Sequence, residues 1–333
     1  MYDIDFVIPY VDSTDPQWQA RFAEYKKAET GVAPTDSSIS RYRNGVDLRY
    51  WFRAVQQYAP WVRRVHLLTD GQLPDWVNLE CPKLNWVRHS DILPAEILPI
   101  FNCNPFEVNL HRIPDLAEHF VYFNDDIFLT RPVSPDRFFK DGKPLDMAVL
   151  NPVLHQQDVM RGILSNDIAL INKSFSKWKC ILKHPGKWFY PGYRSMMLRT
   201  LLSLWTPGFV AFWESHLAHA YLKKTFEEVW TQHGDRLRQV NSRFRSASDI
   251  NQWLFSYWQM AEGDFHPANF LNDSRFFYEI EKDCSEIVDS ICQHKYSVIL
   301  MNDSSSIQNY QQTIERIEHA FATTLPVKSV FEK

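Results

Sequence analysis

The sequence of 333 residues lacks several features that would mark other protein classes. No apolar run approaches the roughly 18–20 residues that a helix needs to cross a bilayer. Only 10 residues are Gly, which excludes collagen-like repeats and Gly-rich linkers. The five Cys include no CxxC pair, so we expect reduced thiols instead of disulfides or a zinc site. The start, MYDIDFVIPYVD, has no basic region or cleavage site, which predicts no signal peptide and a cytoplasmic protein.

Several catalytic signatures are also missing. The absence of GxGxxG, GxxxxGK[ST], HExxH and GxSxG disfavours dinucleotide oxidoreductases, P-loop NTPases, zinc proteases and serine hydrolases. The net charge of −4 argues against nucleic acid as the main partner. Aromatic residues, in contrast, are abundant, with 12 Trp, 14 Tyr and 23 Phe. Trp and Tyr rings can stack on sugars, although a single Trp is more often part of a core.

Short apolar runs alternate with amphipathic segments in the first 150 residues. A helix is expected at Gln17–Lys27, and a second after Asp47, which can cap it, up to Pro60. The apolar runs predict strands at Asp5–Val11, Val65–Thr69, Leu84–Val87 and Phe120–Phe123. This alternation predicts an α/β fold with a mostly parallel, Rossmann-like sheet.

The rest of the chain is more helical. Helices are predicted at His216–His233 and Ser248–Ala261, and Tyr296–Met301 predicts a strand that could rejoin the sheet, followed by an amphipathic helix. We therefore expect one domain over 1–333. It comprises a Rossmann-like core (1–150), a large helical insertion (151–290), and a C-terminal strand and helix that complete the core (291–333).

Polar residues stand where the predicted strands end, and ligands bind at such ends in parallel sheets. They are Asp12, Asp70 and the run Asn124-Asp125-Asp126. Burying adjacent carboxylates is costly unless something compensates, and a divalent cation bridging a diphosphate is one solution. A simple turn is the alternative. A second pair, Asn302-Asp303, follows the C-terminal strand and could converge on the same ion.

Basic and imidazole side chains form a further set of candidates. Arg matches phosphate oxygens, so Arg clusters in an acidic protein suggest a small anionic ligand, with a solvated surface as the alternative. His can carry protons near neutral pH, although a lone His is more often structural. The candidates are Arg41, Arg43, Arg49, Arg53, Arg236, Arg238, Arg243 and Arg245, together with His111, His216 and His219.

Four blocks in order resemble the Stealth family of sugar-phosphate transferases. The family includes bacterial capsular polysaccharide phosphotransferases and the catalytic subunit of the lysosomal-enzyme N-acetylglucosamine-1-phosphotransferase. The blocks are Asp5–Trp18, Arg41–Val133 with its HRIP and NDD motifs, His216–Trp258, and Val298–Ser305. Four details differ from the usual family pattern: Asn102–Glu107 replaces "NSxAIE", Pro9-Tyr10 replaces "TW", the loop at Asp12 lacks Gly, and Ala218 replaces a common Pro before His219.

The resemblance implies a GT-A-like fold and transfer of hexose-1-phosphate from a UDP-sugar to a hydroxyl of a growing capsular or cell-surface polysaccharide. UMP would leave. In this reading 1–150 binds the nucleotide sugar, and 151–290 binds the acceptor and phosphate. The acceptor would be an oligosaccharide or a lipid-linked glycan. A glycosyltransferase that releases UDP is the nearest alternative, and a non-catalytic carbohydrate-binding protein is a more distant one. A lipid-linked acceptor would bring the protein to the inner face of the membrane. The aromatic stretch Trp188–Tyr193 or Leu201–Phe212 would then make the contact.

The resemblance also implies residue roles. His219 would be the general base, with Asp126 as the alternative; Arg245 would hold the phosphate charge, and Glu107 would orient a hydroxyl. Mg²⁺ or Mn²⁺ would be held by Asp125, Asp126, Asn302 and Asp303. Substrate binding is expected from Asp12, Asp70, Arg41, Arg49, His111, Arg112, Asn124 and Asp249.

Overall fold

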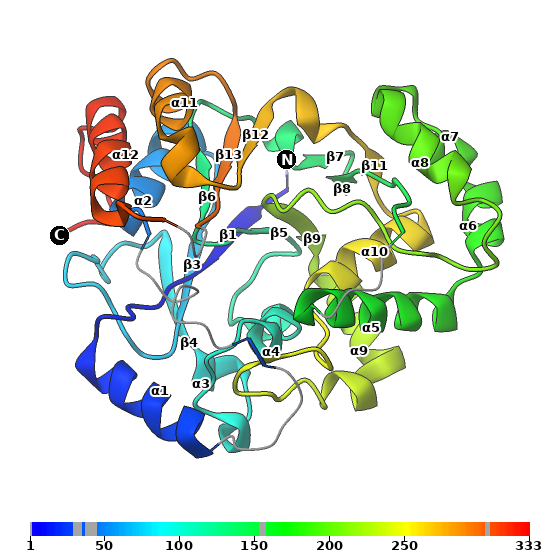
Figure 1. Ribbon diagram of the computed structural model, residues 1–333, viewed down its shortest axis with the longest axis horizontal. Coiled ribbons are helices and arrows are strands. Elements are labelled where there is room, and N and C mark those ends of the chain that lie inside the picture. Colours follow the sequence, from blue (N-terminus) through cyan, green and yellow to red (C-terminus); the bar gives the residue numbers. More distant parts are fainter. Residues whose placement is uncertain (1, 29–34, 37–44, 153–157, 304–306) are drawn as a thin grey trace.

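A five-stranded sheet forms the centre of the computed structural model, which describes residues 2–28, 35–36, 45–152, 158–303 and 307–333. The strand order is β4 (Leu84–Arg88), β3 (Val65–Thr69), β1 (Ile4–Pro9), β5 (His119–Tyr122) and β9 (His219–Leu222). The first four strands are parallel and β9 is antiparallel to β5 (Figure 1). The prediction of an α/β fold with a mostly parallel sheet is therefore confirmed.

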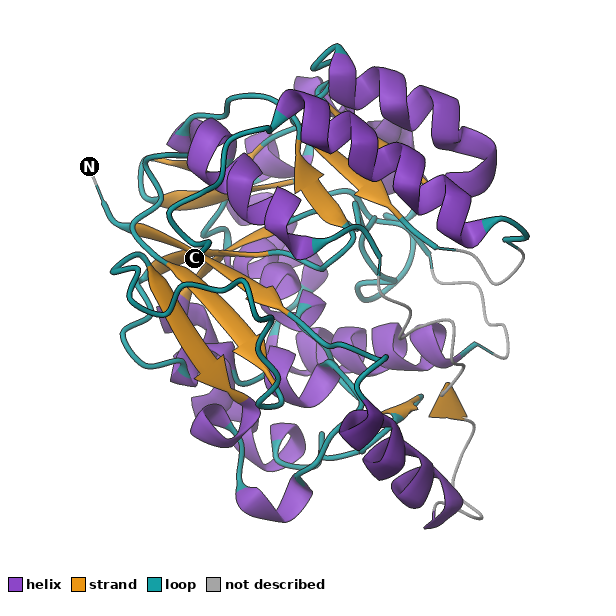
Figure 2. Ribbon diagram, turned by 90° about the vertical axis from the view of Figure 1, so that its left-hand side faces the viewer, coloured by secondary structure: helices purple, strands orange, loops and turns teal. Residues whose placement is uncertain are grey.

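Helices cover both faces of this sheet (Figure 2). Alternate side chains of β1 point to opposite sides, so Phe6 joins one hydrophobic core and Val7 the other. The first core includes α2 (Leu48–Tyr58), α11 (Ile280–Cys292) and α12 (Tyr310–Thr324). The second includes α5 (Val159–Ser174), α9 (Lys223–Leu237) and α10 (Trp253–Glu262). A further helix, α1 (Pro16–Ala28), follows β1.

Helix α2 shows how local sequence sets these bounds. The Asp47 side chain accepts a hydrogen bond from the Arg49 backbone N–H at 2.9 Å, which caps the first turn. Trp51, Phe52 and Val55 recur at helical spacing and are buried against the sheet. The helix ends at Tyr58, just before Pro60, as the sequence predicts.

Smaller sheets flank the centre. One has the order β12-β13-β6, another β11-β8-β7, and a third pairs β2 with β10. Their bounds are β2 (Thr35–Asp36), β6 (Ile127–Leu129), β7 (Phe139–Lys140), β8 (Lys143–Asp146), β10 (Arg245–Ser246), β11 (His266–Pro267), β12 (Ser274–Phe277) and β13 (Val298–Met301). Short helices complete the chain: α3 (His89–Ile92), α4 (Asn104–Glu107), α6 (Lys177–Lys183), α7 (Pro185–Trp188) and α8 (Met197–Leu202).

Three predictions about the later part of the chain are wrong. The segment His216–His233 is not one helix, because its start pairs with β5 as strand β9 and the helix begins only at Lys223. The predicted helix from Ser248 begins at Trp253 instead. The C-terminal strand β13 does not rejoin the central sheet but lies between β12 and β6. A four-residue apolar run fits strand and helix equally well, and pairing partners are non-local.

The five cysteines are free thiols, as expected. Within the described ranges, no helix combines the length and apolar character needed to span a membrane.

A buried carboxylate anchors the start of the central sheet. Asp5 on β1 is fully buried and accepts hydrogen bonds from Arg63 Nε at 2.8 Å, His66 Nε2 at 2.9 Å and the Ala117 backbone N–H at 2.8 Å. Burial alone would raise the pKa of Asp5, but the hydrogen bonds from His66 and Arg63 outweigh it and hold that pKa below its ordinary value of 3.8. The carboxylate therefore ties β1 to β3 and to the segment before β5.

We predict that Asp5→Ala lowers the free energy of unfolding by about 3–5 kcal/mol in urea titrations, because it leaves buried donors without an acceptor. The folded-state pKa lies below the unfolded one, so the wild type should lose this stabilisation as the pH falls below 3.8, and the variant should lack that step. The exposed Asp136→Ala is the control and should change stability by less than about 0.5 kcal/mol. Equal losses in both variants would contradict the role of Asp5.

Candidate functional site

A cavity of about 810 Å³ opens at the carboxyl ends of the parallel strands. Tyr10 and Val11 line it after β1, Asp70 after β3, and Asn124 with its two neighbouring acids after β5. This is the edge at which parallel α/β sheets bind ligands, because the loops that leave the strands converge there. The cavity is therefore the candidate active site.

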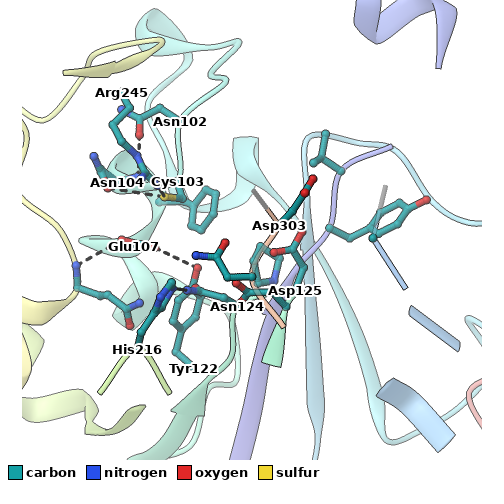
Figure 3. Close-up of a pocket in the computed structure, with 18 of the residues that line it drawn as sticks. Asn102, Cys103, Asn104, Glu107, Tyr122, Asn124, Asp125, His216, Arg245 and Asp303 are labelled. Atoms are coloured by element: carbon teal, nitrogen blue, oxygen red, sulfur yellow. Dashed lines mark hydrogen bonds between the residues drawn. The ribbon is translucent and has the colours of Figure 1, made fainter. Parts of the chain in front are cut away.

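Two Asn-Asp pairs meet on one side of the cavity. Strand β6 begins directly after Asp126, and the antiparallel β13 ends directly before Asn302, so the two polar turns lie at the same end of the sheet. The Met301 backbone N–H donates to the Asp126 carbonyl at 2.9 Å and locks this arrangement. Asp125, Asp126, Asn302 and Asp303 all line the cavity. Figure 3 shows Asp125 and Asp303 on the same side of the cavity.

This acidic side has the chemistry of a cation site. Enclosure in the cavity and the charge of Asp125 raise the pKa of Asp126 well above its ordinary value. One Asp126 oxygen, Oδ1, is buried and has no hydrogen-bond partner within the described chain. No three His, Cys, Asp or Glu side chains of the described residues stand close enough to hold an ion alone. The oxygen set fits Mg²⁺ or Mn²⁺, which commonly combine one or two carboxylates with phosphate oxygens.

The opposite wall is held by the buried Asp249. Its Oδ2 accepts hydrogen bonds from Asn102 Nδ2 at 2.7 Å, Asn104 Nδ2 at 2.9 Å and the Ser246 backbone N–H at 3.0 Å. These bonds join the segment that enters α4 to strand β10, which carries Arg245. The family resemblance predicts that Asp249 binds substrate, but this residue does not line the cavity, and its carboxylate orders the backbone beside Arg245.

Glu107 and Arg245 come together on this wall (Figure 3). Glu107 accepts hydrogen bonds from Tyr122 Oη at 3.2 Å and from the Gln252 backbone N–H at 3.4 Å. Burial raises the pKa of Glu107, although the positive charge of Arg245 opposes that shift. Arg245 Nη2 lies 3.0 Å from Cys103 Sγ. The cavity thus has carboxylates on one side and a guanidinium on the other.

The cavity contains His216, not His219. His216 lies just before β9, and its Nε2 accepts a hydrogen bond from Asn124 Nδ2 at 3.3 Å. Burial lowers the pKa of His216 to about 4, so its ring is neutral at physiological pH. His219 is the first residue of β9 and is buried beside Glu214, with 3.5 Å between His219 Nε2 and Glu214 Oε2. His219, the base predicted from the sequence, therefore lies outside the cavity. His216, three residues earlier, lines the cavity.

Other predicted binding residues are scattered. Asp70 lines the cavity and pairs with Arg21 at 2.8 Å, whereas the Asp12 carboxylate bonds its own loop at the Thr14 backbone N–H, 2.9 Å away. Arg49 pairs with its helix cap, Asp47. None of Asp12, Arg49, His111 and Arg112 lines the cavity.

His111 and Arg112 pack on Trp230 instead. The His111 and Trp230 ring centroids are 5.8 Å apart, and the Arg112 guanidinium carbon lies 4.6 Å from a Trp230 ring centroid. Of the other candidate arginines, Arg53 pairs with Glu332 at 2.8 Å. Arg41 and Arg43 lie outside the described residues.

Sequence reasoning missed several side chains that shape the site. Tyr122 and Gln252 fix Glu107, and Asn102 and Asn104 bind Asp249. The unusual FNCNPFE segment was the available signal, because two Asn close to a short helix start are typical of residues that bond locally or to a buried partner. That partner is 145 residues away from Asn104, so the pattern alone did not identify it.

Known proteins similar to this chain are polysaccharide phosphotransferases. The family model "Stealth protein CR2, conserved region 2" matches residues 41–146. The chain is 38% identical to the receptor polysaccharide phosphotransferase WefC of Streptococcus oralis, over 100% of both chains. It is 35% identical to the capsular polysaccharide phosphotransferase WcwK of Streptococcus pneumoniae, over 100% of this chain and 99% of that protein. It is also 35% identical to the exopolysaccharide phosphotransferase cps2G of Lactiplantibacillus plantarum, over 100% and 97%.

Similarity to solved structures is weak. Mouse xyloside xylosyltransferase 1 in its apo form is 12% identical, with a TM-score of 0.35 over 90% of this chain and 97% of that chain. The apo structure of the bifunctional glycosyltransferase WbbM is 10% identical, with a TM-score of 0.38 over 98% and 50%. Likeness at this level supports no conclusion about the site.

We predict that Asp249→Ala lowers the free energy of unfolding by about 3 kcal/mol, because three donors around it lose a charged acceptor inside the protein. Urea unfolding followed by circular dichroism measures the loss. Asp235→Ala is the matched control, since the Asp235 side chain is 98% exposed, and it should cost less than about 0.5 kcal/mol. An Asp249→Ala protein as stable as the control would show that the wall does not depend on this carboxylate.

Proposed function

This chain belongs to the Stealth family of polysaccharide phosphotransferases, and we propose that it transfers hexose-1-phosphate from a UDP-sugar to a hydroxyl of a growing capsular or cell-surface polysaccharide. Its relatives make it an enzyme of the transferase class. One observation supports the finer proposal. Two Asn-Asp pairs line one side of the cavity, and Arg245 and His216 line the other. A sugar diphosphate needs such a combination of cation-binding oxygens, a fixed positive charge and a proton acceptor.

The acidic side would hold the diphosphate through a cation. Mg²⁺ or Mn²⁺ bound by Asp125, Asp126, Asn302 and Asp303 would neutralise phosphate oxygens and polarise the phosphorus. Asp70, at the end of β3, would contact the nucleotide part. In this proposal residues 1–150 serve the nucleotide sugar, and residues 151–290 supply the groups that act on the phosphate and the acceptor.

Arg245, Glu107 and His216 would carry the transfer. Arg245 would hold the non-bridging oxygens of the sugar-bearing phosphate, where negative charge persists through the transition state. Glu107, fixed by Tyr122 and Gln252, would orient a sugar hydroxyl. His216 takes the place of His219 as the proposed base, since its neutral imidazole lies in the cavity. Its Nε2, which accepts the Asn124 hydrogen bond, is the nitrogen that would take the proton in exchange for that bond.

The bonds change at one phosphorus. The acceptor oxygen attacks the phosphorus that carries the hexose, in line with the bridging oxygen of the diphosphate. A new phosphorus–oxygen bond forms to the acceptor, and the bond to the bridging oxygen breaks. The acceptor proton moves to His216, and UMP leaves with the bridging oxygen. The product is a phosphodiester between hexose and glycan.

We predict that the purified protein, given a panel of UDP-sugars, Mg²⁺ or Mn²⁺ and capsule-type oligosaccharide acceptors, releases UMP and that chelation of the metal stops the release. Chromatography of the nucleotide products measures this. Asp126→Asn should lower turnover at least about a hundredfold, since it weakens the cation site. Asp136→Asn, on an exposed surface, should leave it unchanged. Release of UDP would mean glycosyl transfer and would refute the proposal.

We also predict that His216→Gln lowers kcat by about 10²–10⁴, the usual contribution of a general base. Because the pKa of His216 is about 4, wild-type activity should not fall through its protonation between pH 8 and 5, and should drop as the pH approaches 4. His319→Gln, an exposed histidine, is the control. If His219→Gln keeps its stability but abolishes turnover while His216→Gln stays active, the base is His219 as the sequence suggested.

A further inference from the structure

Exposed apolar side chains gather on one edge of the molecule. Helices α6, α7 and α8 lie together at the right-hand edge of Figure 1. Six of the eleven exposed large hydrophobic residues of the described chain belong to this region. We call them the α6–α8 patch: Trp178 (42% exposed), Leu182 (73%), Leu198 (58%), Leu201 (47%), Leu202 (65%) and Trp205 (84%). Large exposed apolar patches on a folded protein mark surfaces that meet a partner.

A buried lysine links the two helices of the patch. Lys177, at the start of α6, is buried, and its Nζ donates to the Ser203 carbonyl at 3.0 Å, the Leu204 carbonyl at 3.1 Å and Thr206 Oγ1 at 2.8 Å. These acceptors follow the end of α8, so the ammonium group joins the two helices and holds Trp178 near the segment of Trp205. The exposed side chains therefore sit on an ordered platform.

The chain segment that carries the patch has charge of one sign. Between Ile168 and Trp213 the sequence has no Asp or Glu, in a chain with 40 acidic residues overall. The same stretch carries Lys173, Lys177, Lys179, Lys183, Lys187, Arg194 and Arg199. All except Lys177 and Lys187 are exposed. Two copies meeting at this surface would bring like charges together, which disfavours a second copy as the occupant.

We propose that the α6–α8 patch docks the protein on an anionic lipid bilayer. Trp and Leu side chains would enter the boundary between headgroups and acyl chains, and the exposed Lys and Arg would contact lipid phosphates. Trp prefers this boundary because its ring is apolar and its N–H is polar. A surface that combines these residues, on a segment without acids, fits a negatively charged membrane better than a neutral partner.

Helix α5 connects this surface to the cavity. Met160 and Leu164, in its first half, line the cavity, and its last residue, Ser174, is followed closely by α6. Its 16 residues span roughly 24 Å. An acceptor glycan anchored in the same bilayer would therefore be presented within reach of the cavity. The docking itself does not depend on the proposed reaction.

Vesicle flotation with the full chain tests the proposal. We expect binding to vesicles of phosphatidylcholine mixed with phosphatidylglycerol, and little binding to phosphatidylcholine alone. Leu201→Ser/Trp205→Ser should weaken the partition at least tenfold, and Lys179→Glu/Lys183→Glu should remove the preference for the anionic lipid. The control Leu79→Ser/Val327→Ser changes exposed apolar residues outside the patch and should bind like the wild type. Thermal unfolding by circular dichroism verifies that each variant is folded.

Three results would overturn the proposal. They are no flotation of the wild type with anionic vesicles, equal weakening by patch and control variants, and a dimer in sedimentation velocity that only the patch variants break. The last result would assign the surface to a second copy. Turnover with a soluble acceptor should be unchanged in Leu201→Ser/Trp205→Ser, so a failure of membrane docking is distinguishable from a failure of the proposed reaction.

Discussion

The carboxylate of Asp249 organises the side of the cavity on which the phosphate would be handled. It accepts hydrogen bonds from two asparagines that precede Glu107 and from the backbone of Ser246, the residue after Arg245. Chain segments about 140 residues apart are thereby held in one wall. Buried donors without an acceptor are costly, so this carboxylate stabilises the wall. The carboxylate therefore orders the segments that carry Glu107 and Arg245, while Tyr122 and Gln252 fix the Glu107 side chain itself.

A backbone bond plays the corresponding role on the acidic side. The hydrogen bond from the Met301 N–H to the Asp126 carbonyl fastens the end of β13 to the start of β6. Carboxylates contributed by two distant segments then face Arg245 across a shared space. Such a cavity matches a ligand that has a cation at one end and phosphate oxygens at the other. The charges therefore favour a metal–diphosphate complex over a neutral sugar.

The acidic cavity and the apolar α6–α8 patch lie in different parts of the molecule. The cavity is lined by the acids Asp70, Glu107, Asp125, Asp126 and Asp303, whereas the α6–α8 patch is apolar and lies on a segment whose charged residues are all basic. Helix α5 spans the distance between them, with one end at the cavity and the other at the patch. The fold thus keeps a surface suited to lipid apart from a site suited to an ionised donor.

Elements with local signals follow from the amino-acid sequence. The strand Val65–Thr69 and the helix after Asp47 were predicted because apolar spacing and capping act within a few residues. The acids that follow strands, such as Asp125 and Asp303, are likewise identified from the sequence. Tertiary structure alone decided that β13 pairs with β6, that Asp249 binds two asparagines, and that His216 instead of His219 enters the cavity. Each of these outcomes depends on where a strand starts or on a partner more than 90 residues away, and periodicity contains no information about either.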